Sequence, residues 1–279
     1  MNKMFSILPD FLRDPDAFFN DIQRNTRVPE KALQLALSSL FSLTVYGFTV
    51  GISHSLAQAF SAAFKMPLLF LSTMLFCLPA LYFFSLALLG TPLKMIQVLT
   101  VVLTGISVTS FLLLGLAPIT LFFALTSNNY AFFQLMAVCF VGLSGWIGVY
   151  FLWRGMTRVE TAREDRLKQL GNRILFLWIL LYGFIGTQMT WRLSPFISDP
   201  AQPFVFIQPS RDNFYVDVIH ALQRALELQS LNVDWLLPLA IVLFCLIVFV
   251  GFISVGGLFL ASIFKKTQPV EPPAASVAG

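Results

Sequence analysis

Residues 183–215 read GFIGTQMTWRLSPFISDPAQPFVFIQPSRDNFY and mark the point where an apolar helix gives way to irregular chain. In the helical part, small residues repeat on one face at helical spacing: Gly183, Gly186, Thr187 and Thr190. Small residues on a lipid-embedded helix let a second helix approach closely. Four prolines between 195 and 209 then prevent the helix from continuing. Because irregular backbone cannot lie in lipid with unpaired polar groups, we expect an outer cap over 191–229 that rests on the bilayer.

The end of this helix carries the side chains that lipid tolerates least. Gln188 and Arg192 lie one turn apart on a second face and should look into a bundle, a cavity or the headgroups. We expect Trp191 and Arg192 at the outer interface, with Arg192 paired to a carboxylate of the cap or to a lipid phosphate. The cap is then either an anchoring belt or a binding surface, and the sequence leaves both readings open.

The composition of the whole chain is that of an integral membrane protein. Its 279 residues are 57% hydrophobic and 11% charged, with a mean hydropathy of +0.78, whereas a soluble core of this size would need far more polar surface. We therefore expect an all-α fold, a six-span bundle within 33–266. The apolar runs long enough to cross the hydrocarbon layer lie near 33–60, 67–90, 95–125, 130–153, 173–193 and 235–263.

The segments that flank the bundle are predicted to be short and interfacial. Residues 1–32 include a helix that Asp14 can cap and Pro15 can open, with Phe18, Phe19 and Ile22 as its apolar face. We expect this amphipathic helix, and a second one over 213–229 in the outer cap, to lie along the membrane. The proline- and alanine-rich tail 267–279 is predicted to be disordered. The N-terminus has no apolar core typical of a removable signal peptide, so we expect the first span to insert directly.

The distribution of basic residues predicts the orientation. With six spans, fourteen Lys and Arg lie on the side of both termini and four on the other. The side richer in Lys and Arg faces the cytoplasm, so we expect both termini there, in a bacterial inner membrane.

The most basic connection, 154–172, is predicted to form a cytoplasmic helical hairpin that Gly171 and Asn172 end. It is either a solvated charged helix or a docking site for a protein subunit or anionic lipid. The residues that would make such contacts are Arg158, Arg163, Arg166 and Lys168.

Motifs for chemistry are absent from the sequence. None of the six apolar runs contains Asp or Glu, which argues against a proton-coupled transporter or pump. The three cysteines lie apart in apolar runs and no hydrolase, zinc or phosphate-binding motif occurs. We therefore expect no enzyme, cofactor or metal and no nucleic-acid partner. A haem or metal shared by His54 and His220 is a distant alternative.

Hydroxyl residues follow one face of the third predicted span. Thr100, Thr104 and Ser107 either pack this helix against another or, together with Gln188, line a polar path. The polar path is the best sequence argument for a transporter. The recurring glycines of the first and fourth spans, Gly47 and Gly51 with Gly142, Gly145 and Gly148, predict close helix packing.

Part of the chain resembles the Yip-type family of multi-pass membrane proteins, particularly its bacterial members. The resemblance rests on Pro15-Asp16-Ala17-Phe18-Phe19-Asn20-Asp21-Ile22 before the first span and on Leu88-Leu89-Gly90 at the end of the second. The Asp-Leu-Tyr-Gly-Pro signature of the eukaryotic members is missing, and six predicted spans replace the usual five. The resemblance implies a non-enzymatic membrane protein that works through partners or membrane organisation.

We therefore expect a non-enzymatic scaffold or accessory subunit whose partners are membrane lipids and other membrane or cytoplasmic subunits. The alternative is a transporter or channel component for a small or lipidic solute, with the first, third and fifth spans lining its path.

Overall fold

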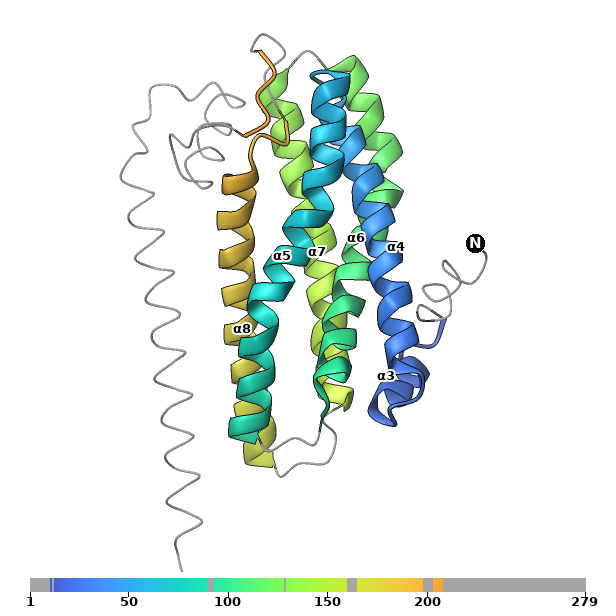
Figure 1. The fold of residues 1–279 in the computed structure, drawn as a ribbon, viewed down its shortest axis with the longest axis vertical. Coiled ribbons are helices and arrows are strands. Elements are labelled where there is room, and N and C mark those ends of the chain that lie inside the picture. Colours follow the sequence, from blue (N-terminus) through green and yellow to red (C-terminus); the bar gives the residue numbers. More distant parts are fainter. Residues whose placement is uncertain are drawn as a thin grey trace, which may run out of the picture.

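The computed structural model describes residues 11, 13–89, 93–127, 129–159, 165–197 and 203–207, without the side chains of 84–89, 165–170 and 191. This part of the chain contains helices and no strand (Figure 1). The helices are α3 (Pro15–Gln23), α4 (Val28–Gly51), α5 (Leu56–Leu89), α6 (Met95–Thr126), α7 (Tyr130–Val159) and α8 (Asp165–Leu193).

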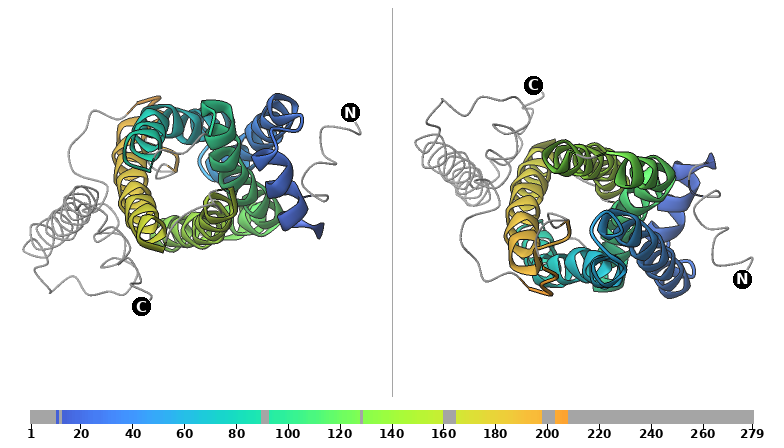
Figure 2. Two further views of the ribbon diagram at one scale, coloured as in Figure 1. Left: turned by 90° about the horizontal axis from the view of Figure 1, so that it is seen from below. Right: turned by 90° about the horizontal axis from the view of Figure 1, so that it is seen from above.

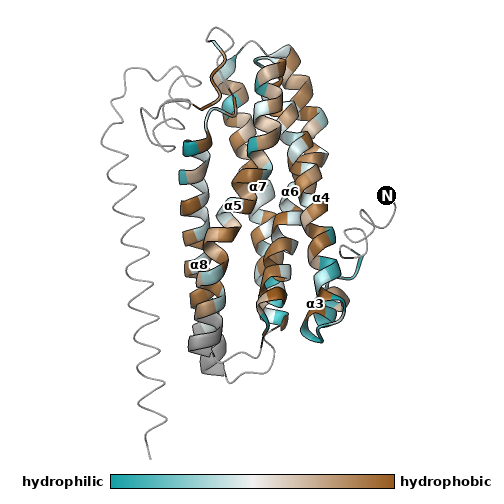
Figure 3. Ribbon diagram, viewed as in Figure 1, coloured by the Kyte–Doolittle hydropathy of each residue, from teal (hydrophilic) through white to brown (hydrophobic). Residues whose placement is uncertain are grey.

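Five helices are long and apolar enough to cross a membrane. Their candidate spans are Val28–Gly51, Leu56–Phe83, Met95–Thr126, Tyr130–Val159 and Gly171–Thr190. Hydrophobic residues dominate these helices, and hydrophilic ones gather at α3 and at the helix ends (Figure 3). The described part of the chain is thus all-helical, as predicted, and five of its helices could cross a membrane. The predicted sixth span 235–263, the helix 213–229 and the tail 267–279 lie outside the described residues.

The predicted first span, 33–60, is wrong at its end. Helix α4 stops at Gly51, and α5 begins at Leu56, so that Pro67 lies inside a helix rather than at its start. The reason is a helix-capping serine, Ser55, just before the start of α5. The hydroxyl oxygen of Ser55 accepts a hydrogen bond from the backbone N–H of Gln58 at 3.2 Å, which caps the new helix.

The predicted helix stop at Gly171 and Asn172 is also wrong, because α8 runs through both residues. Packing on α5 explains the continuation. Just beyond Asn172, Leu175 and Trp178 are buried, and the Trp178 indole N–H donates to the carbonyl oxygen of Cys77 at 2.8 Å. Helix α7 extends to Val159, and residues 160–164 between the two helices lie outside the described part.

The helices form a ring when viewed along their axes. Helix α4 packs on α5 and α6, α6 on α7, and α5 on α8, whereas α7 and α8 barely touch. Figure 2 shows α5, α6, α7 and α8 around the axis of the bundle, with α3 on the side away from α8. The ring is therefore weakest between α7 and α8.

Glycines set the closest approaches. A Cβ on Gly47 would lie 2.5 Å from the carbonyl oxygen of Ala62 on α5, and one on Gly148 would lie 2.6 Å from that of Gly105 on α6. Neither helix pair could approach so closely with a larger residue. Gly142 and Gly145, on the same predicted stripe as Gly148, have nothing within 4 Å of a Cβ.

The N-terminal helix α3 begins as its sequence predicts and then docks on the bundle. The Asp14 carboxylate accepts from the N–H of Ala17 at 3.0 Å, and Pro15 opens the helix. Phe19 and Ile22 are fully buried in a cluster with residues of α6 and α7. This apolar face therefore contacts protein, and the predicted placement of the helix in the membrane interface stays a prediction.

Candidate functional site

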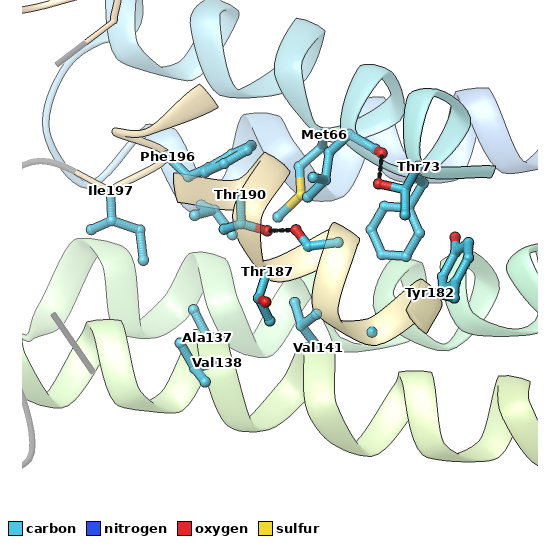
Figure 4. A pocket seen from close by; sticks show the side chains of 15 residues that line it. Met66, Thr73, Ala137, Val138, Val141, Tyr182, Thr187, Thr190, Phe196 and Ile197 are labelled. Atoms are coloured by element: carbon cyan, nitrogen blue, oxygen red, sulfur yellow. Dashed lines mark hydrogen bonds between the residues drawn. The ribbon is translucent and has the colours of Figure 1, made fainter. Parts of the chain in front are cut away.

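An apolar cavity of about 260 Å³ lies inside the ring, at the end where α8 leads into the proline-rich segment. Helices α5, α7 and α8 supply most of its walls, and none of its lining residues comes from α6. On α8 it is lined by the face of small residues singled out in the sequence, and Figure 4 shows its side chains from close by. The other lining residues are Val50, Met66, Leu69, Phe70, Thr73, Ala137, Val138, Val141, Tyr182, Phe196 and Ile197.

The threonine hydroxyls of the lining already donate hydrogen bonds to backbone carbonyls. Thr73 donates to the carbonyl oxygen of Leu69 at 2.7 Å, one turn back on its own helix. Thr187 and Thr190 do the same on α8, each at 2.8 Å. The hydroxyl of Tyr182 is buried and has no hydrogen-bond partner among the described residues. The cavity is thus suited to hold hydrocarbon and offers little to a polar ligand.

Phe196 and Ile197, from the segment after α8, close the cavity at the end nearest that segment (Figure 4). Two buried polar side chains of α5 hold this segment in place. The amide nitrogen of Gln58 donates to the carbonyl oxygens of Pro195 at 2.7 Å and Phe196 at 3.3 Å. We call residues 195–197 and 203–207 together the roof segment.

Lys65, only 1% exposed, is the second anchor of the roof segment. Its ammonium group donates to the carbonyl oxygens of Pro195, at 3.2 Å, and Phe206, and lies 4.7 Å from the centroid of the Phe206 ring. A buried ammonium group needs such partners because burial removes its water. Backbone carbonyls and an aromatic face supply them here.

Comparisons with known proteins give no identity. No family model matches the sequence, and neither the curated proteins nor the solved structures contain a match.

The hydroxyl stripe of the third predicted span lies between α4 and α6. Thr100 and Thr104 are fully buried and donate to carbonyl oxygens of their own helix, at 2.6 and 2.8 Å. Ser107 crosses to α4, where its hydroxyl donates to the carbonyl oxygen of Leu35 at 3.1 Å and lies 2.7 Å from that of Ser39. The structure does not bring this stripe to Gln188, which is half-buried on α8 and does not line the cavity.

The small-residue face of α8 has a different role from the one its pattern suggested. Gly183 and Gly186 line the cavity, and a Cβ on Gly186 would meet only Thr73, at 3.7 Å, while one on Gly183 would meet nothing within 4 Å. No close helix contact is made at either residue. A pattern of small residues shows that space is left free but not what fills it.

The predicted basic contacts fall mostly beyond the described side chains. Arg158 is exposed and donates to the Asp16 carboxylate at 3.2 Å. Arg154 donates to the same carboxylate at 3.0 Å. Arg163 lies outside the described residues, as do the side chains of Arg166, Lys168 and Trp191. Arg192 is exposed in the last turn of α8, and its candidate carboxylate partners in the cap (Asp199, Asp212 and Asp217) lie outside the described part.

The ring nitrogen Nδ1 of His54 lies 2.9 Å from the hydroxyl of Ser55, and His220 lies outside the described part. Within the described ranges no group of three His, Cys, Asp or Glu could hold a metal.

Sequence reasoning missed both anchors of the roof segment. Gln58 lies within the predicted first span 33–60, and Lys65 lies between that span and the next, where it contributes only to the count of basic residues. The signal was a lysine and a glutamine, seven residues apart, in a chain with few polar residues.

Proposed function

We propose that this chain is a non-enzymatic membrane protein, a scaffold or accessory subunit, that works by holding an apolar ligand inside its helical ring. The observation that supports the proposal is the apolar cavity beneath the roof segment. Its lining is mostly aliphatic and aromatic, so it can hold a ligand by burial and dispersion.

The chemistry of the lining favours binding over catalysis. Tyr182 is the only titratable residue among the fifteen that line the cavity. The three threonine hydroxyls already bond to backbone carbonyls, so no general base activates them as nucleophiles. The likeness to Yip-type proteins, which we retain as part of the proposal, fits a role in membrane organisation.

We further propose that the protein resides in a bacterial inner membrane with both termini in the cytoplasm. The excess of Lys and Arg on the side of the termini supports this orientation. The basic connection 154–172 would then be available to cytoplasmic subunits or anionic lipid.

A transporter or channel component for a lipidic solute is the second candidate. One observation favours it: Gly183 lines the cavity and is exposed, beside the weak contact between α7 and α8 where an opening would lie. A solute could enter and leave at this point.

Mass spectrometry of whatever co-purifies with the protein in mild detergent tests the proposal. Gly186→Leu fills the cavity, because a Cβ there has room and the longer side chain occupies ligand space. Gly115→Leu is the matched control, since Gly115 is exposed on α6 with nothing within 4 Å of a Cβ. We expect an apolar compound with the native protein and with Gly115→Leu, and its loss in Gly186→Leu.

The same apolar compounds in equal amounts in all three proteins, or none in any, would reject the proposed function. A compound whose uptake into vesicles depends on the native cavity would instead establish the transporter.

A further inference from the structure

We propose that the occupant of the cavity is a single acyl chain of a membrane lipid, which enters sideways at Gly183. This inference rests on the proposed function and names the ligand class. It commits to hydrocarbon rather than to a protein segment or a polar solute.

We place the opening of the cavity at its side, between α7 and α8, which barely touch. It lies within the candidate spans of α5, α7 and α8, which acyl chains would surround in a membrane. At its side, Gly183 is exposed, and its neighbours Phe184 and Leu181 on the same helix are 36% and 39% exposed. The roof segment closes the end through Phe196 and Ile197, so the exposed side is the way in.

The shape of the cavity fits one hydrocarbon chain. Its lining on α8 runs from Tyr182 to Thr190, which is a length of about 12 Å at the rise of an α-helix. A volume of about 260 Å³ over that length lets the centre of a water-sized sphere move across roughly 5 Å, so the cavity itself is about 8 Å wide. An α-helix with its side chains is about 10–12 Å across and does not fit. A single chain of methylene groups, with carbon contacts near 4 Å, does.

The lining also offers too few hydrogen-bonding groups for an extended peptide. Each peptide unit brings an N–H and a C=O that must be paired away from water. The hydroxyls of Thr73, Thr187 and Thr190 already donate to their own helices, and Tyr182 alone remains. An acyl chain has no polar groups along its length, so it makes no such demand.

Photolabelling in phosphatidylcholine vesicles tests the inference. The vesicles contain a small fraction of a phosphatidylcholine whose acyl chain carries a diazirine, and labelled residues are located by mass spectrometry. Met66 reports the cavity, because it lines the cavity and is only 7% exposed. Phe122 on α6 reports ordinary lipid contact, because it is 59% exposed.

We expect Met66 to be labelled in the native protein and in Gly115→Leu. In Gly186→Leu the labelling of Met66 should fall about tenfold, as a loss of about 1.4 kcal/mol of binding free energy would produce, with Phe122 unchanged. Constant labelling of Phe122 shows that Gly186→Leu remains folded in the membrane.

Absence of label from Met66 in the native protein, or equal labelling in Gly186→Leu, would overturn the inference. If an apolar compound other than a lipid still co-purifies and is lost in Gly186→Leu, the proposed function stands and only the acyl chain is rejected.

Discussion

The ammonium group of Lys65 on α5 donates a hydrogen bond to the carbonyl oxygen of Pro195, 3.2 Å away and 130 residues further along the chain. The same group bonds to the carbonyl oxygen of Phe206, so that one buried side chain joins both parts of the roof segment to the bundle. The roof over the cavity thus depends on an interaction between parts of the chain far apart in sequence.

Replacing Lys65 by Met should loosen the roof segment. Methionine fills similar space but cannot donate, so the carbonyl oxygen of Phe206 loses its donor and that of Pro195 keeps only Gln58. The loss should cost about 1–3 kcal/mol in all. Limited proteolysis of proteoliposomes should cut within 195–207 faster than in the native protein. Lys94→Met is the control, because Lys94 is exposed at the start of α6. Equal cleavage of the two variants would contradict the anchoring role.

Packing rather than charge should hold α3 on the bundle. A Cβ on Gly155 would lie 2.5 Å from the Phe19 ring and 2.9 Å from Val101, both fully buried. Gly155→Ala should therefore lower the free energy of unfolding by about 1–3 kcal/mol, as overpacking does elsewhere.

Asp16→Asn is the comparison for Gly155→Ala, because it weakens the ion pairs of α3 with Arg154 and Arg158. These side chains are 34–51% exposed, so the change should cost about 1 kcal/mol or less. Thermal unfolding in mild detergent measures both variants. A larger loss in Asp16→Asn than in Gly155→Ala would show that charge dominates the docking.

The hydroxyl stripe of α6 should contribute to stability at one residue in particular. Ser107→Ala removes the hydrogen bonds to Leu35 and Ser39 on α4, and an interhelical hydrogen bond in a membrane contributes about 0.6 kcal/mol. Thr104→Val should change stability less, because its hydroxyl bonds only to its own helix. Unfolding in detergent gives the comparison. If Thr104→Val is the more destabilised variant, this account of the stripe is wrong.

The orientation can be tested by labelling single cysteines in whole cells, after the natural cysteines are replaced by serine. A cysteine at Val205, which is 38% exposed in the roof segment, should react with a membrane-impermeant thiol reagent. One at Thr161 should react only after the cells are opened, because the basic connection is predicted to be cytoplasmic. Reaction of Thr161→Cys in intact cells would reverse the orientation.

The sequence by itself determined the helical, apolar class of the protein and the approximate places of its five described candidate spans. Backbone N–H and C=O groups have no water to bond to in hydrocarbon, so a long apolar run must form a helix that pairs them internally. Local chemistry likewise determined the start of α3, since the Asp14 carboxylate accepts a hydrogen bond from the N–H of Ala17, only three positions away. Such features need no knowledge of distant residues.

Only the tertiary structure decided which faces meet and which leave space. Gly145 and Gly148 have the same chemistry and lie three residues apart on one helix, yet only Gly148 touches α6. The cavity joins residues from Val50 to Ile197, and Lys65 meets Pro195 across 130 positions. Helical periodicity assigns a residue to a face but not to a partner, because the partner depends on how separate helices pack. The candidate site therefore arises from packing between helices, which the pattern along any one helix does not encode.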